Sequence, residues 1–447
     1  MSDTTGQRAP RPRLGRDYQR LFLASTISNL GDGIFLVALP LLAARLTRDE
    51  VKVSLVTAAM ALPWLVLSLP IGTMIDRSDR KKVLVVADLA RAAIIATLAV
   101  SAATDHVEIW MLWVAALALG TAEVFFDNAS QALLPSVVAP ELLERANGRR
   151  SAGELTANVF VGTPLGSVLF AMAVWLPFGA DAATFVMAVL LILPIRGSFR
   201  AVAQPAVRTT TVVGETKDGL RWLWRHPLLR TIAISVGLSN LGFSMAQAVF
   251  VLFAQERLGI SERGFGLLLG VMGIGAIVGS LLGERISARV GQSFAIFAVL
   301  GTWAVTMAGT GLVLVTWFVV LMAFLESMAA TVWNVVTVSL RQQIVPSELL
   351  GRVNSVYRWF GWGTLPIGAV IGGQVARHFG LRAPYLVGAG AVLIALLVAM
   401  RHVNPGAIVA ARAAAHERTA DAAPGSDPAE GAADHTPLHA ERDSLFD

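Results

Sequence analysis

The sequence predicts an all-α membrane protein that crosses the bilayer twelve times, and three observations support this fold class. The 447 residues are 55% hydrophobic, with a mean hydropathy of +0.63. Only 15% of them are charged, against about 25% in an ordinary soluble domain. A soluble fold of this length would lack the charge to cover its surface, so we expect lipid to be its main solvent.

The third observation is a series of twelve apolar runs, each close to the roughly 20 residues that a helix needs to cross the bilayer. They cover residues 21–46, 53–75, 83–103, 109–135, 151–174, 177–195, 228–254, 264–286, 293–315, 317–340, 356–377 and 383–401. The runs lack the two-residue alternation of a barrel strand, so each is predicted to be helical. The first run is too long for a signal-peptide core and has no small-residue cleavage site behind it.

The basic residues predict the orientation. If the N-terminus is cytoplasmic, 28 of the 36 Lys and Arg residues fall in cytoplasmic segments and seven fall outside, with Arg91 inside the third helix. Cytoplasmic loops carry such an excess of positive charge. We therefore expect a multi-pass protein of the cytoplasmic membrane with both termini inside. This topology explains the net charge of +5 without a nucleic-acid partner.

Short motifs of the first half recur in the second half, in the same order and at offsets between 201 and 211 residues. The matched segments are 28–31 with 239–242, 76–77 with 284–285, 141–147 with 348–354, and 162–166 with 363–368. Such a repeat indicates duplication. We therefore expect two six-helix halves in parallel orientation.

The chain is expected to have five parts. These are a cytoplasmic N-terminal segment (1–20), an N-terminal six-helix bundle (21–195), a cytoplasmic linker (196–227), a C-terminal six-helix bundle (228–401) and a disordered cytoplasmic tail (402–447). Leu220, Leu223 and Trp224 follow helical spacing, which favours a linker helix on the inner membrane face; a plain tether is an equal alternative. The tail has few large apolar residues and therefore no core to fold around.

Cysteine is absent, which excludes disulfides, thiolate metal sites and thiol nucleophiles. The seven histidines lie in loops, at helix ends or in the tail, and no metalloprotease, nucleophile-elbow or phosphate-binding motif is present. We expect no cofactor, no bound metal and no enzymatic activity.

The loop between the second and third helices, residues 72–82, reads GTMIDRSDRKK. Gly72 permits close helix approach, Asp76 can face a helix N-terminus, and the basic residues can meet anionic headgroups. Charges that only set the topology are the simpler alternative.

This loop resembles the signature loop of the major facilitator superfamily, and the duplicated six-plus-six layout over residues 18–401 is similar to that superfamily. The SNLGDG run in the first helix and the ELLxRxN loops resemble the branch that holds the enterobactin exporter and macrolide and tetracycline efflux pumps. The resemblance implies alternating access, in which two bundles rock about a central site.

The resemblance also implies a cytoplasmic latch. In the first half its residues are Gly72, Asp76, Arg77 and Arg80, and in the degraded second-half loop they are Glu284 and Arg285. Two departures weaken the link to proton antiport. No Arg occurs between Leu112 and Gly120 in the fourth helix, and the exporter pattern of the fifth helix is only partly matched by residues 162–167.

Carboxyl groups within the apolar runs indicate function, because an acid at a helix centre costs about 2.5 to 3.5 kcal/mol even on insertion scales. The proton-coupling candidates are Asp32, Glu123, Asp127 and Glu326. A carboxyl group that loses its water shell binds a proton more readily, which coupling requires. A structural acid satisfied by its neighbours is the alternative for each. We expect Asp32, with Glu123 or Asp127, to be the proton site.

Other polar residues within the runs have different expected roles. Asp88 and Arg91 are three residues apart and are expected to form a structural ion pair, while Glu154 and Asp181 lie nearer to helix starts. The substrate-cavity candidates are the amides Asn29, Asn158, Asn240, Gln247 and Asn334.

We therefore expect a monomeric secondary active transporter that exports a drug-like or siderophore-like small molecule in exchange for protons. Two alternatives stay open, namely an importer of a small metabolite and a polytopic membrane enzyme. The substrate, the direction of transport and the coupling ion are not determined by these motifs.

Overall fold

The computed structural model describes residues 14–67, 70–76, 78–195, 199 and 212–421. The regular elements of this part are all helices and it contains no strand, so the predicted all-α class is confirmed. Helices are the expected solution, because a helix satisfies its own backbone hydrogen bonds in lipid.

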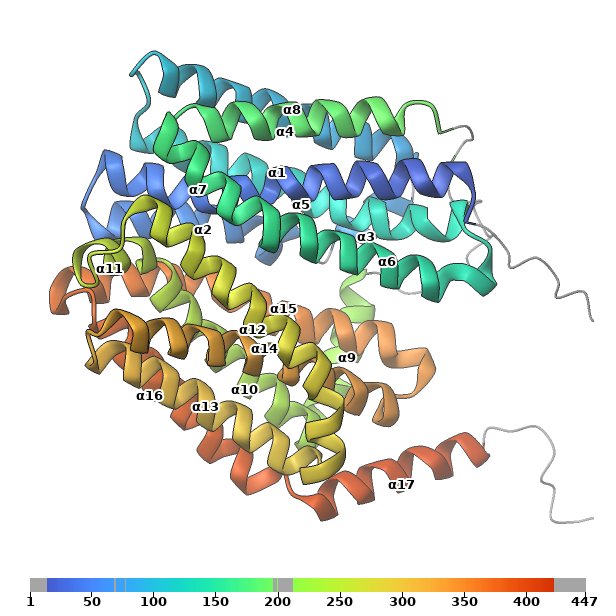
Figure 1. Ribbon diagram of the computed structural model, residues 1–447. Coiled ribbons are helices and arrows are strands. Elements are labelled where there is room, and N and C mark those ends of the chain that lie inside the picture. The colour runs from blue at the N-terminus through green and yellow to red at the C-terminus, as the bar shows by residue number, and fades with distance from the viewer. Residues whose placement is uncertain (1–13, 68–69, 77, 196–198, 200–211, 422–447) are drawn as a thin grey trace, which may run out of the picture.

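The first half of the chain forms one group of helices (Figure 1). Its members are α1 (Arg16–Leu46), α2 (Glu50–Leu67), α3 (Ile71–Asp76), α4 (Arg80–Ala103), α5 (Ile109–Val137), the 3-10 turn η1 (Pro140–Leu142), α6 (Leu143–Leu155), the π-helical segment η2 (Thr156–Gly162), α7 (Thr163–Met172) and α8 (Leu176–Ile192). Helix α1 packs against α8 and α7, and α4 packs between α5 and α8.

The second half forms a second group. Its members are α9 (Val212–Arg225), α10 (Pro227–Gln247), α11 (Phe250–Glu256), α12 (Glu262–Val290), α13 (Gln292–Leu312), α14 (Thr316–Ile344), α15 (Ser347–Phe379), α16 (Ala383–His402) and α17 (Pro405–Asp421). Helix α12 packs on α14, α10 on α15 and α16, and α13 on α16.

Ten of these helical segments are long and apolar enough to cross a membrane. Two more predicted spans are present as helices without meeting that standard. Helix α8 is apolar but only 17 residues long, and α15 contains polar and glycine residues over much of its length. The chain is thus a multi-pass membrane protein whose helices follow the twelve predicted runs.

The structure corrects three details. The predicted fifth run is built from α6, η2 and α7, and the seventh run, 228–254, is broken after Gln247 into α10 and α11. The tail 402–447 was expected to be disordered, but residues Pro405–Asp421 form α17, which packs on α13 and α14. Ile408 and Ala411 supply an apolar contact there that the overall composition hides. Residues 422–447 lie outside the described part.

The linker prediction falls partly outside the described residues, but its second part is the helix α9. This helix packs against α15 and α10, with Leu223 fully buried and the Trp224 ring half exposed. The Trp224 ring lies 6.2 Å from that of Phe360 in α15. Helix α9 is therefore attached to the second group by side-chain packing.

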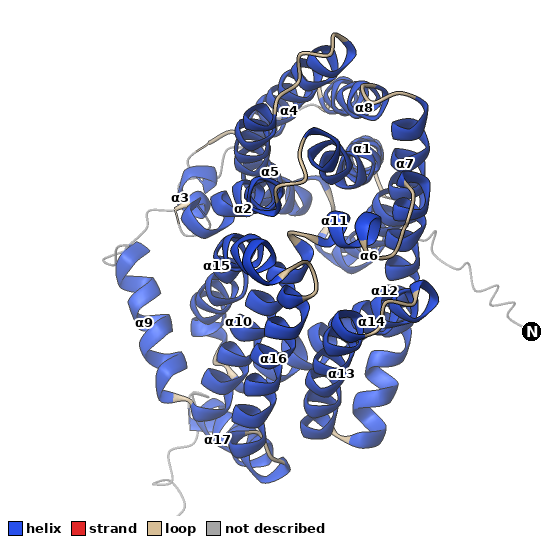
Figure 2. Cartoon of the chain, turned by 90° about the vertical axis from the view of Figure 1, so that its left-hand side faces the viewer, coloured by secondary structure: helices blue, strands red, loops and turns tan. Residues whose placement is uncertain are grey.

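The two groups of helices meet at one end of the molecule and separate toward the other (Figure 1). We call the end that carries the start of α1, the start of α4 and α17 the basic end, because Arg16, Arg80, Lys81 and Lys82 lie there. The other end, at residues 47–49 and 257–261, is the distal end. Figure 2 views the molecule from the distal end and shows the two groups on either side of a central seam.

Small residues let the two groups approach each other along this seam. Helix α2 packs on α15, and α7 packs on α12. A Cβ atom at Gly373 would overlap the Ser54 side chain, and one at Gly266 would overlap that of Ser167. Small residues at helix crossings let backbones come close in lipid, where dispersion and not the hydrophobic effect drives association.

A similar contact fixes α1 against η2 within the first group. An added Cβ at Gly33 would overlap the carbonyl oxygen of Asn158, which belongs to backbone and cannot swing aside. The π-helical segment η2 widens the helix at this crossing, and such segments are frequent at functional sites. This contact positions Asn158 beside the residues of α1.

We expect Gly33→Ala to destabilise the purified protein by about 1 to 3 kcal/mol through overpacking, visible as a lower midpoint of thermal unfolding. The matched control is Gly301→Ala in α13, where an added Cβ meets no atom within 4 Å. Gly301→Ala should leave the midpoint unchanged or raise it, because Ala favours the helix. Equal midpoints for the two variants would contradict this interpretation.

Candidate transport cavity

A cavity of about 390 Å³ lies on the seam between the two groups of helices. This volume is within the range of sites for drug-sized ligands, about 300 to 1,000 Å³. The first group contributes the charged residues Asp32, Arg91, Glu123 and Asp181. Apolar and aromatic side chains of both groups complete the wall, including the rings of Trp64 and Trp362, which lie 4.8 Å apart across the seam. The cavity is thus apolar with one charged side.

Arg91 is the centre of that charged side. Its guanidinium Nη1 lies 3.9 Å from Oδ1 of Asp32 and 3.8 Å from Oδ1 of Asp88. The same guanidinium interacts electrostatically with Glu123 and Asp127. Arg91 is 4% exposed and Asp88 is fully buried, whereas 34% of the Asp32 side chain is accessible. Of the two carboxylates within 4 Å of the buried guanidinium, Asp32 is therefore the one that solvent or a ligand can reach.

Aromatic rings hold the guanidinium in place. The Arg91 Cζ atom lies 4.9 Å from the centre of the Phe126 ring and 5.0 Å from that of Phe185. Such cation–π contacts contribute about 2 kcal/mol when the cation is desolvated. Arg91 Nη1 and both carboxylate oxygens of Asp88 make no hydrogen bond to the described residues. The cluster is therefore held by long ion pairs and ring contacts, which constrain geometry less than short hydrogen bonds.

The predicted ion pair of Asp88 with Arg91 is part of this larger group and is not an isolated pair. Asp181 also joins it, although the sequence placed this residue at a shallow position. It is fully buried, lines the cavity and interacts electrostatically with Asp32 and Arg91. Sequence reasoning missed this because α8 starts only five residues before Asp181, whereas α8 is short and packs deep against α1.

The other two proton candidates lie away from the wall of this cavity. Asp127 is one helical turn beyond Glu123 on α5, where it interacts electrostatically with Arg91, Arg150 and Arg358. Glu326 belongs to α14 in the second group and borders two smaller cavities. The four candidates are thus not gathered in one place.

The five predicted amides separate in the same way. Asn158 and Gln247 line the central cavity. Asn240 borders a cavity of the second group and donates a hydrogen bond to the Gly361 carbonyl oxygen at 2.8 Å. Asn29 and Asn334 each donate to a carbonyl of the preceding turn of their own helix and do not line the central cavity.

The predicted latch is only partly visible. Arg77 and the side chain of Asp76 lie outside the described residues, and Gly72 belongs to α3. The guanidinium of Arg80 donates to the Ala132 carbonyl oxygen at 2.7 Å, which ties the start of α4 to the end of α5. In the second group, Glu284 and Arg285 are exposed on α12.

A set of residues that the sequence did not indicate joins the two groups at the distal end. Arg45 of α1 forms a bidentate ion pair with Glu262 of α12, at 2.8 and 3.1 Å. Arg48 donates to Gln255 at 2.8 Å and lies 3.7 Å from Glu256. We call these five residues the distal clamp. A sequence signal existed, because Arg45 and Arg48 are among the few basic residues outside the predicted cytoplasmic segments.

Comparison with known proteins decides the family. Residues 12–422 match the family model described as transmembrane secretion effector, which covers almost the whole folded chain. The chain belongs to this family of the major facilitator superfamily. The predicted resemblance is confirmed, and both the family and the fold indicate a membrane transporter of small molecules.

Relatives of this major facilitator protein include efflux pumps. It is 27% identical over 384 residues to the multidrug efflux pump Tap of Mycolicibacterium fortuitum, covering 82% of this chain and 90% of that protein. It is 20% identical over 397 residues to macrolide efflux protein A of Streptococcus pyogenes, covering 87% and 96%. Among solved structures, nucleoside transporter NupG (D323A mutant) superposes with a TM-score of 0.71 at 13% identity, covering 87% and 100%. That last likeness concerns the fold alone.

We expect Arg91→Gln to destabilise the transporter by about 3 to 5 kcal/mol, because it leaves buried carboxylates without their cation. Adding Asp88→Asn should restore part of the loss, since it removes one of the unpaired charges. The measurement is the midpoint of thermal unfolding of the purified variants, with Arg257→Gln as an exposed control. A double variant no more stable than Arg91→Gln would show that Asp88 does not depend on Arg91.

Proposed function

We propose that this protein is a proton-coupled exporter of drug-like small molecules that works by alternating access. The central cavity carries the proposal, because it combines an apolar, aromatic wall with more carboxyl groups than cations on one side. Such a site can bind an apolar molecule, and its carboxyl groups can exchange protons beside that molecule. The efflux pumps among the relatives support the same direction of transport.

In this proposal the two groups of helices are the moving bodies. The distal clamp joins the groups by hydrogen bonds and ion pairs at one end, while the groups separate toward the basic end (Figure 1). The excess of Lys and Arg at the basic end supports a cytoplasmic location for it. The conformation is then open to the cytoplasm, ready to load a substrate for export.

Asp32 is the proposed proton-carrying residue, assisted by Glu123 of the same cavity. Asp32 is accessible from the cavity and lies 3.9 Å from Arg91. A proton on Asp32 weakens its attraction to Arg91, and its release restores that attraction. The proton and a bound substrate thus act on the same guanidinium, and this shared contact is how transport can be coupled.

We expect Asp32→Asn to reduce substrate-induced proton flux by about tenfold or more, because the amide cannot exchange a proton at this position. Flux is measured in everted membrane vesicles with a panel of macrolides, tetracyclines, aminoglycosides, cationic dyes and catecholate siderophores. Asp105→Asn is the matched control, since Asp105 is exposed and has a left-handed backbone (φ 56°) that Asn also adopts.

Flux that is triggered by one compound class and survives in Asp32→Asn would remove Asp32 from the mechanism. Absence of flux for every compound, with folded and inserted protein, would favour the importer alternative, which the NupG-like fold also accommodates. Inward uptake of a metabolite would then be the function to test.

Breaking the distal clamp should shift the protein toward an outward-open state. We expect Glu262→Gln to raise the reaction rate of Val53→Cys, a cavity-lining position in α2, with a membrane-impermeant thiol reagent on intact cells by about two- to fivefold. The gain is modest because the ion pair is partly exposed. The natural chain has no cysteine, so the introduced thiol is unique.

Reversing the pair, with Arg45→Glu and Glu262→Arg together, should return the rate to that of the parent Val53→Cys protein. An unchanged rate in Glu262→Gln would show that the clamp does not control the equilibrium. Slower labelling of intact cells in Glu262→Gln than in the parent protein would contradict the proposed orientation.

A further inference from the structure

Two smaller cavities follow the central cavity into the second group of helices, and each shares lining residues with the one before it. Gln247 and Phe250 border both the central cavity and a narrow neck of about 20 Å³. Phe243 and Glu326 border both that neck and a further cavity of about 180 Å³ between α10, α12, α13, α14 and α16. We call this further cavity the Glu326 pocket. A ligand in the central cavity could therefore extend a group past Glu326.

The carboxyl group of Glu326 lacks a counter-charge. Within the described residues it forms no ion pair, whereas the acids of the first group surround Arg91. The buried guanidinium of the same helix, Arg341, is fifteen residues further along, or about 22 Å, and lies over the Tyr357 ring at 3.7 Å. An ionisable side chain at membrane depth indicates a functional site by default.

Two buried hydroxyl groups beside Glu326 also lack partners. Ser239 Oγ lines the pocket and is 3% exposed, and Tyr385 OH lines the neck and is 6% exposed. Neither makes a hydrogen bond to the described residues. A buried polar group without a partner costs about 1 to 3 kcal/mol, so such groups are kept where something binds them.

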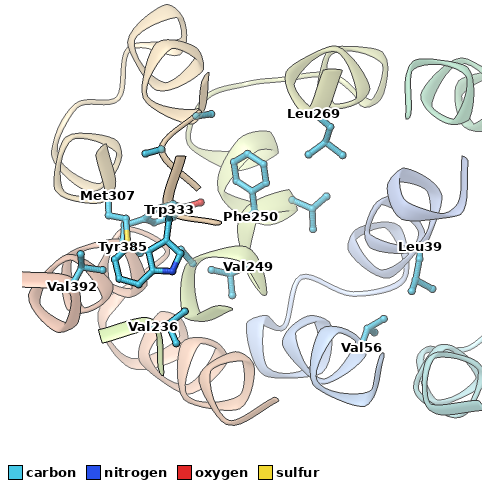
Figure 3. Packing of buried hydrophobic residues seen from close by; sticks show 14 of the residues in the cluster. Leu39, Val56, Val236, Val249, Phe250, Leu269, Met307, Trp333, Tyr385 and Val392 are labelled. Carbon is cyan, nitrogen blue, oxygen red and sulfur yellow. The ribbon is translucent and has the colours of Figure 1, made fainter. Parts of the chain in front are cut away.

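The Glu326 pocket also has two aromatic rings in its wall, those of Phe243 and Trp303. The Trp303 ring lines the pocket and lies 5.5 Å from the Trp333 ring, and the Trp303 indole N–H donates to the Glu326 carbonyl oxygen at 3.1 Å. Figure 3 shows Trp333, Met307 and Tyr385 close together in the second group, with Phe250 toward the seam. Aromatic faces attract cations, and quaternary ammonium groups are bound in such surroundings.

We propose that the Glu326 pocket binds the ammonium group of a substrate whose apolar body lies in the central cavity. The carboxylate supplies the charge, the indole ring supplies a cation–π surface, and the lone pairs of the hydroxyl oxygens can face the cation. The pocket is too small for a drug-sized body but suits a short aminoalkyl arm. The inference rests on the proposed function of the central cavity as the transport site.

The test compares two fluorescent probes of equal shape. Both carry a dansyl group; one ends in an ethyl-trimethylammonium arm and the other in the neutral 3,3-dimethylbutyl arm. Binding is measured on the purified full-length protein in nanodiscs, without a proton gradient. We expect wild type to bind the cationic probe about tenfold or more tightly than the neutral one. Glu326→Gln should abolish this preference and leave the affinity for the neutral probe unchanged.

Two variants separate charge recognition from a structural role. Glu326→Asp keeps the charge and should retain part of the preference, whereas Glu326→Gln keeps the shape and should not. Glu108→Gln, an exposed acid at the distal end, is the control for general loss of negative charge. Equal affinities of wild type for both probes, or a preference that persists in Glu326→Gln, would overturn the inference.

Failure of this inference is distinguishable from failure of the proposed function. If Glu326→Gln loses proton flux but keeps the preference for the cationic probe, Glu326 is a coupling residue and the ammonium pocket is wrong. If proton flux is absent from wild type while the preference depends on Glu326, the pocket stands and proton-coupled export does not.

Discussion

The guanidinium of Arg91 is the interaction on which the charged half of the cavity depends. A buried cation is tolerated only where carboxylates and ring faces replace its water. Four helices supply these partners: α1 through Asp32, α4 through Asp88, α5 through Phe126 and α8 through Phe185. The cluster therefore connects four helices of the first group. Its ion pairs are long, near 3.9 Å, so the contact between Asp32 and Arg91 is weak enough to break.

The second group of helices shares short sequence motifs with the first group but differs from it in the chemistry of the cavity wall. Where the charged wall of the central cavity has a guanidinium among acids, the Glu326 pocket has one carboxyl group beside the Trp303 ring and the Ser239 hydroxyl group. The two groups thus pack corresponding helices in a similar way, while their cavity walls differ. A binding site on the seam between them can contact a charge cluster on one side and an aromatic pocket on the other.

The seam itself combines close packing with weak ion pairs. Glycine–serine contacts bring α2 to α15 and α7 to α12, and the exposed clamp of Arg45 with Glu262 adds at most about 1 kcal/mol. Contacts of this kind stabilise the observed conformation only weakly, so the groups can separate again. An alternating mechanism needs two arrangements of the groups that differ little in free energy.

The sequence by itself determined the elements: apolar runs of bilayer length must be helices, and duplicated motifs implied two similar groups. It also identified Asp32, Glu123, Asn158 and Gln247, because polar residues are rare in such runs. Only the tertiary structure decided which polar residues meet. Arg91 lies among several acids and not in an isolated pair with Asp88, and Asp181 lines the cavity. Glu326 forms no ion pair with the described residues. These contacts depend on how α4, α8 and α14 are rotated and packed against their neighbours. Hydropathy defines where a helix lies in the chain, but it does not define its neighbours.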